Sequence, residues 1–175
     1  MDRFVNSDFD DFLSRIASAD LRAVALHWNE ARGIKQMPCW DDLAPTALSA
    51  YSSMLWGFAY DPKTGMLTGR LAGRRLSRWI DANFYGGQLQ DLHSPANYSE
   101  AQQTLTKTIT TPLAFRSSGR LFKTDGYTVT GERIMLPLAE DGRTGDGILG
   151  ASAYVPPPLL GTPQMVYDNV EWYAI

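Results

Sequence analysis

Two histidines and one cysteine are the side chains of this 175-residue chain that most readily bind a metal ion. His27 and His93 stand far apart, and neither belongs to a His-Glu-x-x-His motif that would place two ligands on one helical face. Cys39 is the only cysteine, so no disulfide can form within the chain. We therefore expect no metal site.

Candidate catalytic arrangements are equally sparse. The sequence contains no Gly-x-Ser-x-Gly elbow and no Gly-Lys-Ser/Thr phosphate loop. Asp10-Asp11 and Asp41-Asp42 are pairs only in sequence, because neighbours on a helix do not face each other and linker aspartates usually serve turns. The chain is therefore expected not to be an enzyme. An isomerase would need an acid–base pair inside a cavity, which the sequence does not show.

Residues 145–150, Gly-Asp-Gly-Ile-Leu-Gly, match the G-x-G-x-x-G pattern of dinucleotide sites. Such a site needs the loop to leave a strand and open a helix, so that helix amides meet the pyrophosphate. Here the segment leaves a polar turn and enters residues 151–155, which have the composition of a strand. We therefore expect a strand rather than a nucleotide site.

Four arginines, Arg70, Arg74, Arg75 and Arg78, fall within nine residues. They could hold an anion or the acidic patch of a partner, but such a cluster in an acidic chain is more often a solvated surface. The net charge of −3 gives no general attraction to nucleic acid or to anionic membranes. No nucleic-acid partner is expected.

The composition is that of an ordinary globular domain, with 44% hydrophobic and 20% charged residues. At 175 residues, one domain with a sizeable core is the natural expectation. No apolar run approaches the ~20 residues of a membrane span. The acidic N-terminus, with Asp2 and Asp8, is unlike a signal peptide. A cytoplasmic protein without a membrane segment is expected.

Residues 7–33 are predicted to be helical, with Ser7 as a cap and Gly33 as the stop. Ser18 and Asp20 could cap a second helix, so a break near residue 18 fits the sequence. One apolar stripe comprises Phe9, Phe12, Leu13 and Ile16, and a second comprises Leu21, Val24, Ala25 and Trp28. Such a helix can cover the domain's own sheet or pair with a second copy. The expected homodimer uses the second stripe.

The hydrophobic period changes within residues 66–92. Leu67, Gly69 and Leu71 alternate with polar neighbours, as in a strand, and helical spacing follows from Leu76 to Phe84. The predicted fold class is α+β: a five-stranded antiparallel sheet with helices from 74–113, including one at 98–113, on one face. The strands are predicted at 55–61, 66–72, 120–129, 132–139 and 147–155, with a turn at Thr130-Gly131.

Three regions are predicted: an N-terminal helical extension at 1–36, a central domain at 37–158 and a C-terminal tail at 159–175. Prolines at 156–158 end the last strand. The tail keeps apolar residues such as Tyr167 and Trp172, so we expect it to dock on its own domain or on a partner.

This order of elements, together with several spaced motifs, resembles the PAS domain superfamily, in particular its short single-domain bacterial branch. The motifs include Arg70-Leu-Ala-Gly73 and the turn Asp91-Leu-His-Ser-Pro95, with further matches at 26–33, 85–92, 132–138 and 147–150. The resemblance spans about residues 20–158. It implies a PAS-like fold that hosts many ligands and sometimes none.

A small-molecule ligand, if one binds, is expected between the inner face of the sheet and the helices at 74–113. Alternation along the strand places Leu67 and Leu71 on that face, with Arg70 pointing away from the core. Arg116 or a tyrosine would orient the ligand. The predicted walls are Leu67, Leu71, Trp79, Phe84, Leu105, Ile109, Arg116, Tyr127, Met135 and Tyr154.

Haem and flavin are both expected to be absent. His93 fits a turn, whereas the resemblance implies a haem ligand on the helix facing the sheet. Cys39 lies in a linker, and the motif around the reactive cysteine of flavin-binding light sensors is missing.

The function implied is that of a sensory PAS module that binds a small molecule or a partner protein. With no output domain of its own, it would act in trans on a separate signalling protein. The alternative is a structural dimerisation or adaptor module with a filled core and no ligand.

Overall fold

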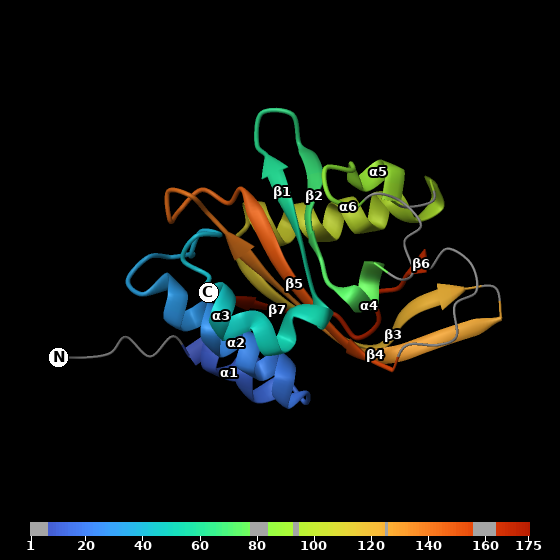
Figure 1. The fold of residues 1–175 in the computed structure, drawn as a ribbon, viewed down its shortest axis with the longest axis horizontal. Coiled ribbons are helices and arrows are strands. Elements are labelled where there is room, and N and C mark those ends of the chain that lie inside the picture. Colours follow the sequence, from blue (N-terminus) through green and yellow to red (C-terminus); the bar gives the residue numbers. More distant parts are fainter. Residues whose placement is uncertain (1–6, 78–83, 93–94, 125, 156–163) are drawn as a thin grey trace.

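A seven-stranded antiparallel sheet forms the centre of the molecule, in a computed structural model that describes residues 7–77, 84–92, 95–124, 126–155 and 164–175. The strands lie in the order β2-β1-β5-β4-β3-β6, and β7 also pairs with β3 (Figure 1). All pairings are antiparallel. The strands are β1 (Leu55–Asp61), β2 (Met66–Ala72), β3 (Leu113–Thr124), β4 (Tyr127–Leu138), β5 (Gly147–Tyr154), β6 (Gln164–Met165) and β7 (Glu171–Ala174).

The five central strands confirm the predicted α+β sheet, but the boundary between β3 and β4 differs from the prediction. Thr130-Gly131 lies inside β4, and Gly126, with a φ of 99°, lies between the two strands. Gly131 is required by packing rather than by a turn: a Cβ there would lie 2.2 Å from the backbone oxygen of Ala153 on β5. A glycine that signals a turn in sequence here allows two strands to approach closely.

Two N-terminal helices cover the outer face of the sheet. α1 (Ser7–Arg15) and α2 (Ala19–Arg32) are separated at the predicted break, where the Ser18 side chain accepts a hydrogen bond from the Leu21 amide. Gly33 ends α2 with a φ of 55°, as expected. The Trp28 indole nitrogen donates to the Pro137 carbonyl at 3.0 Å, which fixes α2 to β4.

The apolar stripe of α2 is buried within this chain. Leu21, Val24, Ala25 and Trp28 are all fully buried, in one cluster with Leu136 and Leu149 of the sheet. The stripe therefore serves the domain's own core, which is one of the two uses that the sequence left open. A homodimer stays a prediction, but it would need a surface other than this stripe.

Helices on the opposite, inner face are α4 (Arg74–Ser77), α5 (Leu89–Leu92) and α6 (Pro95–Thr110). Figure 1 shows α6 on the other side of the sheet from α1 and α2. α6 begins and ends three residues earlier than the helix predicted at 98–113. Pro95 opens α6, where its missing N–H costs nothing, and the chain is already extended at Leu113.

The segment between α2 and β1 folds back over the outer face. It contains a short α3 (Pro45–Leu48), with Pro45 at its first position, and a 3₁₀ turn, η1 (Ser49–Met54). Asp42 holds this segment in place by accepting hydrogen bonds from the Cys39 amide at 2.9 Å and the Lys35 ammonium at 2.7 Å. The Lys35 bond is the main reason that the pKa of Asp42 falls to about 2.

The C-terminal tail docks on its own domain. β6 and β7 extend the sheet beside β3, and β7 pairs from Leu113↔Ala174 to Arg116↔Glu171. The predicted N-terminal extension is therefore a helical layer on this sheet, and the predicted tail supplies two of its strands. In the part of the chain that the model describes, no helix has the length and apolar character needed to cross a membrane.

Gly131→Ala should lower the free energy of unfolding by about 1–3 kcal/mol, because the new Cβ meets backbone that cannot move aside cheaply. Thr130→Ala, at the neighbouring exposed position of β4, should change stability by about 1 kcal/mol at most. Urea unfolding of both variants measures the difference. Equal stability of the two variants would contradict the close-approach role of Gly131.

Candidate functional site

An apolar cluster on the inner face of the sheet contains five of the predicted wall residues. Leu67, Phe84, Leu105, Ile109 and Met135 are all buried and belong to one cluster. They come from β2, the segment before α5, α6 and β4, so the fold brings together side chains that are distant in sequence. The same cluster includes Trp56, Phe58, Leu89, Leu92, Ala101, Phe115 and Ile148; we call these twelve residues the inner cluster. Trp79 lies outside the described residues.

Leu71 lies on the other face from Leu67, which corrects the prediction that they point together. β1 pairs with β2 at Gly57↔Leu71 and Phe58↔Gly69, so Arg70 is an extra residue without a partner. Such a β-bulge breaks the strict alternation of faces. Leu71 consequently packs beneath α3 and η1 with the buried cluster that contains Trp28, Leu136 and Leu149, which we call the outer cluster.

Arg116 also lies on the outer face. Its guanidinium bonds Glu132 at 2.7 Å and lies 3.4 Å from Glu171, and its side chain is 11% exposed. It pairs with Ile134, which belongs to the outer cluster, and therefore cannot orient a ligand on the inner face. The prediction missed this because β3 was expected to begin at residue 120, which left Arg116 without a defined face.

Tyr127 and Tyr154 occupy a different part of the inner face from the inner cluster. Tyr127 stands at the start of β4 and is 41% exposed. Tyr154 is buried in a small cluster with Leu121, Phe122 and Val129, and its ring meets Phe122 edge-on at 5.1 Å. Tyr154 thus borders the inner cluster on the side of Arg133, whereas Tyr127 is too far along the hairpin.

Three polar residues form a row across the inner face. Ser117 pairs with Arg133 in the β3–β4 register, and Arg133 pairs with Ser152 in the β4–β5 register. All three are buried, at 0%, 0% and 2% exposure. Residues facing each other across strands share one face, so this polar row adjoins Met135 and Phe115 of the inner cluster. Ser152 accepts a hydrogen bond from the Trp56 indole at 3.0 Å.

Arg133 is the most unusual member of the row, because a charged group is fully buried without a carboxylate. Its two terminal nitrogens donate to the backbone oxygens of Leu121 at 3.0 Å and Val166 at 3.2 Å. Phe122 and Tyr167 present their rings to the guanidinium at 5.0 and 5.3 Å. None of the described carboxylates pairs with it. Burial lowers the pKa of Arg133, although an arginine stays charged.

Two donors of this row have no partner within the described residues: the Arg133 Nε and the Ser117 hydroxyl. A buried polar group without a partner typically costs about 1–3 kcal/mol. Sequence analysis missed both residues, although a Glu-Arg pair opening the apolar run Ile134–Leu138 was a visible signal. The arrangement can donate hydrogen bonds to an acceptor that is otherwise surrounded by apolar side chains.

On the outer face, Glu132 joins the N-terminal helices to the sheet. Its carboxylate accepts hydrogen bonds from the Ala17 amide at 3.0 Å and the Ser18 amide at 2.8 Å, in addition to Arg116. Glu171 on β7 lies at the other end of Arg116 and accepts a hydrogen bond from the Tyr173 hydroxyl. This partly buried network links both terminal segments to the centre of the sheet.

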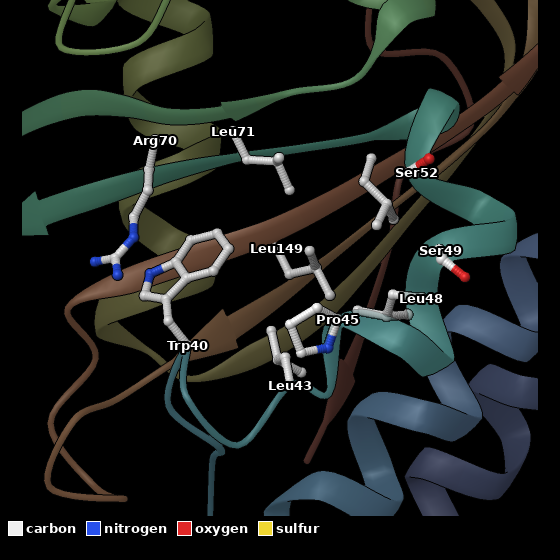
Figure 2. A pocket seen from close by; sticks show the side chains of 10 residues that line it. Trp40, Leu43, Pro45, Leu48, Ser49, Ser52, Arg70, Leu71 and Leu149 are labelled. Atoms are coloured by element: carbon white, nitrogen blue, oxygen red, sulfur yellow. The ribbon is translucent and has the colours of Figure 1, made fainter.

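A pocket opens on the outer face, between α3, η1 and the sheet. It has a volume of about 310 Å³, and Figure 2 shows Trp40, Leu43, Leu71 and Leu149 around it. Arg70 lies at its edge with its guanidinium 5.0 Å from the Trp40 ring. The pocket was not predicted from the sequence, because strand alternation placed Leu71 on the inner face.

Neither histidines nor cysteine form a cluster that could hold a metal: among the residues described, no group of three or more metal-ligating side chains is found. His27 is partly buried on α2, and Cys39 is a free, buried thiol. His93, considered as a haem ligand, lies outside the described residues. The segment 147–150 is part of β5, which confirms a strand in place of a nucleotide loop.

Glu132→Gln should lower the free energy of unfolding by about 3 kcal/mol, the low end for a broken buried ion pair, because Glu171 still compensates Arg116. Asp11→Asn removes the exposed pair with Arg15, at 3.8 Å, and should cost at most about 1 kcal/mol. Denaturant unfolding compares the two. Similar losses in both variants would show that Glu132 does not anchor the helices.

Tyr154→Phe should make the protein less sensitive to alkali. Burial raises the pKa of Tyr154 to about 12, against about 10 for a tyrosine in an unfolded chain. The folded state thus binds the hydroxyl proton more tightly than the unfolded chain does. The neutral tyrosine makes its full contribution to the free energy of unfolding below pH 10, and this contribution is lost as the pH rises toward 12. Urea unfolding at pH 9 and pH 11 should show a smaller loss in the variant. An identical loss would contradict the assignment.

A family model described as a PAS domain matches residues 16–153. One solved structure that is similar is a sensory box histidine kinase/response regulator from Burkholderia thailandensis E264. It is 15% identical, with a TM-score of 0.36, and the match covers 63% of this chain and 82% of that chain. A search of curated proteins found no match.

The family match begins directly after α1 and runs through nearly all of β5, so it includes α2, every central strand and the helices of the inner face. This confirms the resemblance that the spaced motifs indicated. The chain belongs to the PAS domain family.

Proposed function

We propose that this PAS domain is a sensory module that binds a small molecule among the side chains of the inner cluster and acts on a separate protein. PAS domains are typically sensory or signalling modules, which supports the general role. Ligand binding is supported chiefly by two buried donors that have no partner among the described residues, Arg133 Nε and Ser117 Oγ. Both lie beside an apolar cluster. Ligand sites commonly combine apolar walls with a few placed polar groups.

The ligand that suits this arrangement has an anionic or carbonyl oxygen and an apolar body. The oxygen would accept hydrogen bonds from Arg133 and Ser117, and the apolar body would meet residues such as Leu105 and Ile109. Bonds of this kind to a charged donor are stronger than neutral ones. Arg133 also holds the Val166 carbonyl, so a ligand that draws on this guanidinium would act on the C-terminal segment as well.

The alternative is an adaptor module whose core is filled and binds no ligand. The contacts of Arg133 with Leu121, Val166 and two aromatic rings favour it, because they give the arginine a structural role. Ser117 separates the two functions. Its hydroxyl has no intramolecular partner among the described residues, so removing it should weaken ligand binding without destabilising the fold.

Ser117→Ala is therefore the decisive variant, with Ser118→Ala on the opposite face of β3 as the matched control. Native mass spectrometry of freshly purified protein should show a retained small molecule in the wild type and in Ser118→Ala. Occupancy should fall in Ser117→Ala, since losing a hydrogen bond of about 1.5 kcal/mol weakens binding roughly tenfold.

An empty wild-type protein, together with a Ser117→Ala variant that is at least as stable, would support the filled adaptor. The same spectra report the oligomeric state, which tests the predicted homodimer. A substitution in the apolar stripe of α2, such as Trp28→Asp, could not test the dimer, because Trp28 is fully buried and a carboxylate there would unfold the domain.

A further inference from the structure

The outer pocket lies on the opposite face of the sheet from the inner cluster, so it is a separate site. Its floor is formed by Leu55, Leu71 and Leu149 of three adjacent strands, and its walls by Leu43 and Leu48. Figure 2 shows Leu71 and Leu149 pointing toward each other beside the Trp40 ring. At about 310 Å³ the pocket is at the lower end of the range for small-molecule sites.

The bulge in β2 gives this pocket its two kinds of wall. In a regular strand, Arg70 and Leu71 would point to opposite faces, but the extra residue at Arg70 lets both line the same pocket. Figure 2 shows the two side chains directed to the same side of the strand. A cationic group is thus held directly beside an apolar surface.

Arg70 is available to a ligand. Its side chain is exposed, it rests on the Trp40 ring, and it forms no ion pair with a carboxylate of the described chain. Stacking on an aromatic ring leaves the N–H donors at the edge of the guanidinium free for an anion. Arg70 therefore supplies a site for a carboxylate at one end of the pocket.

We propose that the outer pocket binds a small amphipathic carboxylate, with a chain of about eight carbons, whose carboxylate pairs with Arg70 and whose chain packs on Leu71 and Leu149. Charge complementarity selects the carboxylate, and the volume of the pocket limits the length of the chain.

A small molecule fits this pocket better than a protein does. Protein interfaces continue from a central pocket into a wider contact surface with large apolar or aromatic side chains. Among the described residues, the large apolar side chains with strong exposure are Leu26, Ile34, Met66, Tyr85, Tyr127, Val155 and Val170, and none of them lines the pocket. The apolar surface is therefore confined to the concavity.

The test compares sodium octanoate with 1-octanol, which has the same chain and no charge. Two-dimensional NMR spectra of the whole protein report the Trp40 indole N–H, assigned by Trp40→Phe, and the amides of Leu71 and Leu149. Octanoate should shift these signals saturably and bind more tightly than octanol. Arg70→Gln should weaken octanoate binding about two- to fivefold, as for an exposed ion pair, and leave octanol unchanged.

Two further variants make the result specific. Leu71→Trp should fill the pocket and abolish binding of both compounds, whereas Arg74→Gln, which removes an exposed arginine outside the pocket, should change neither. The proposal is overturned if octanoate shifts only inner-face signals such as Met135 and Ile109, or if Arg70→Gln binds octanoate as the wild type does. A shift confined to the inner face would leave the proposed inner-face ligand intact, so the two sites are tested separately.

Discussion

Two adjacent residues of β4 carry buried charges to opposite faces of the sheet, and both ends of the described chain are held by them. Glu132 points to the outer face and binds the amides between α1 and α2. Arg133 points to the inner face and binds the carbonyl of Val166 in the C-terminal segment. Adjacent residues of a strand face opposite ways, so one dipeptide can hold segments that lie on two sides of the sheet. A buried charge must have hydrogen bonds, which makes each attachment specific.

This arrangement gives the sheet a direct mechanical connection to both terminal segments. Arg116 extends the outer network to Glu171 on β7, so the tail is attached on both faces of the sheet. A change in the contacts of Arg133 on the inner face is thus one peptide bond away from the anchor of the N-terminal helices. The connection between the two terminal segments therefore runs through neighbouring residues of one strand.

The two faces of the sheet differ in the kind of site that they offer. The inner face combines a polar row with a large aliphatic and aromatic cluster, and its polar groups are fully buried. The outer pocket is apolar, open at one side, and has its charge at the edge. The bulge at Arg70 separates the two sites, since it assigns Leu67 to the inner face and Leu71 to the outer one. One irregular residue therefore decides on which face Leu71 lies.

The sequence by itself determined the elements and the family. Local patterns decide these, because capping by Ser18, the stop at Gly33 and the change from strand-like to helical spacing after β2 depend on neighbouring residues. The spaced motifs were enough to recognise a PAS domain. Four wall residues of the inner cluster, Leu67, Phe84, Leu105 and Ile109, followed from periodicity, and Met135 was selected for its side-chain type.

Only the tertiary structure decided which face each side chain occupies and where the termini attach. The register between strands depends on cross-strand partners, so one unpaired residue at position 70 reverses Leu71 without any local signal. Gly131 follows a threonine as in a turn, but it lies inside β4, where its missing side chain allows β5 to approach closely. Arg116 and Arg133 are both arginines in strands, and only their partners in space show that one bonds a carboxylate and the other carbonyls. The apolar stripe of α2 could equally have packed against a second copy of the chain. It packs instead on the outer face of the sheet in its own chain.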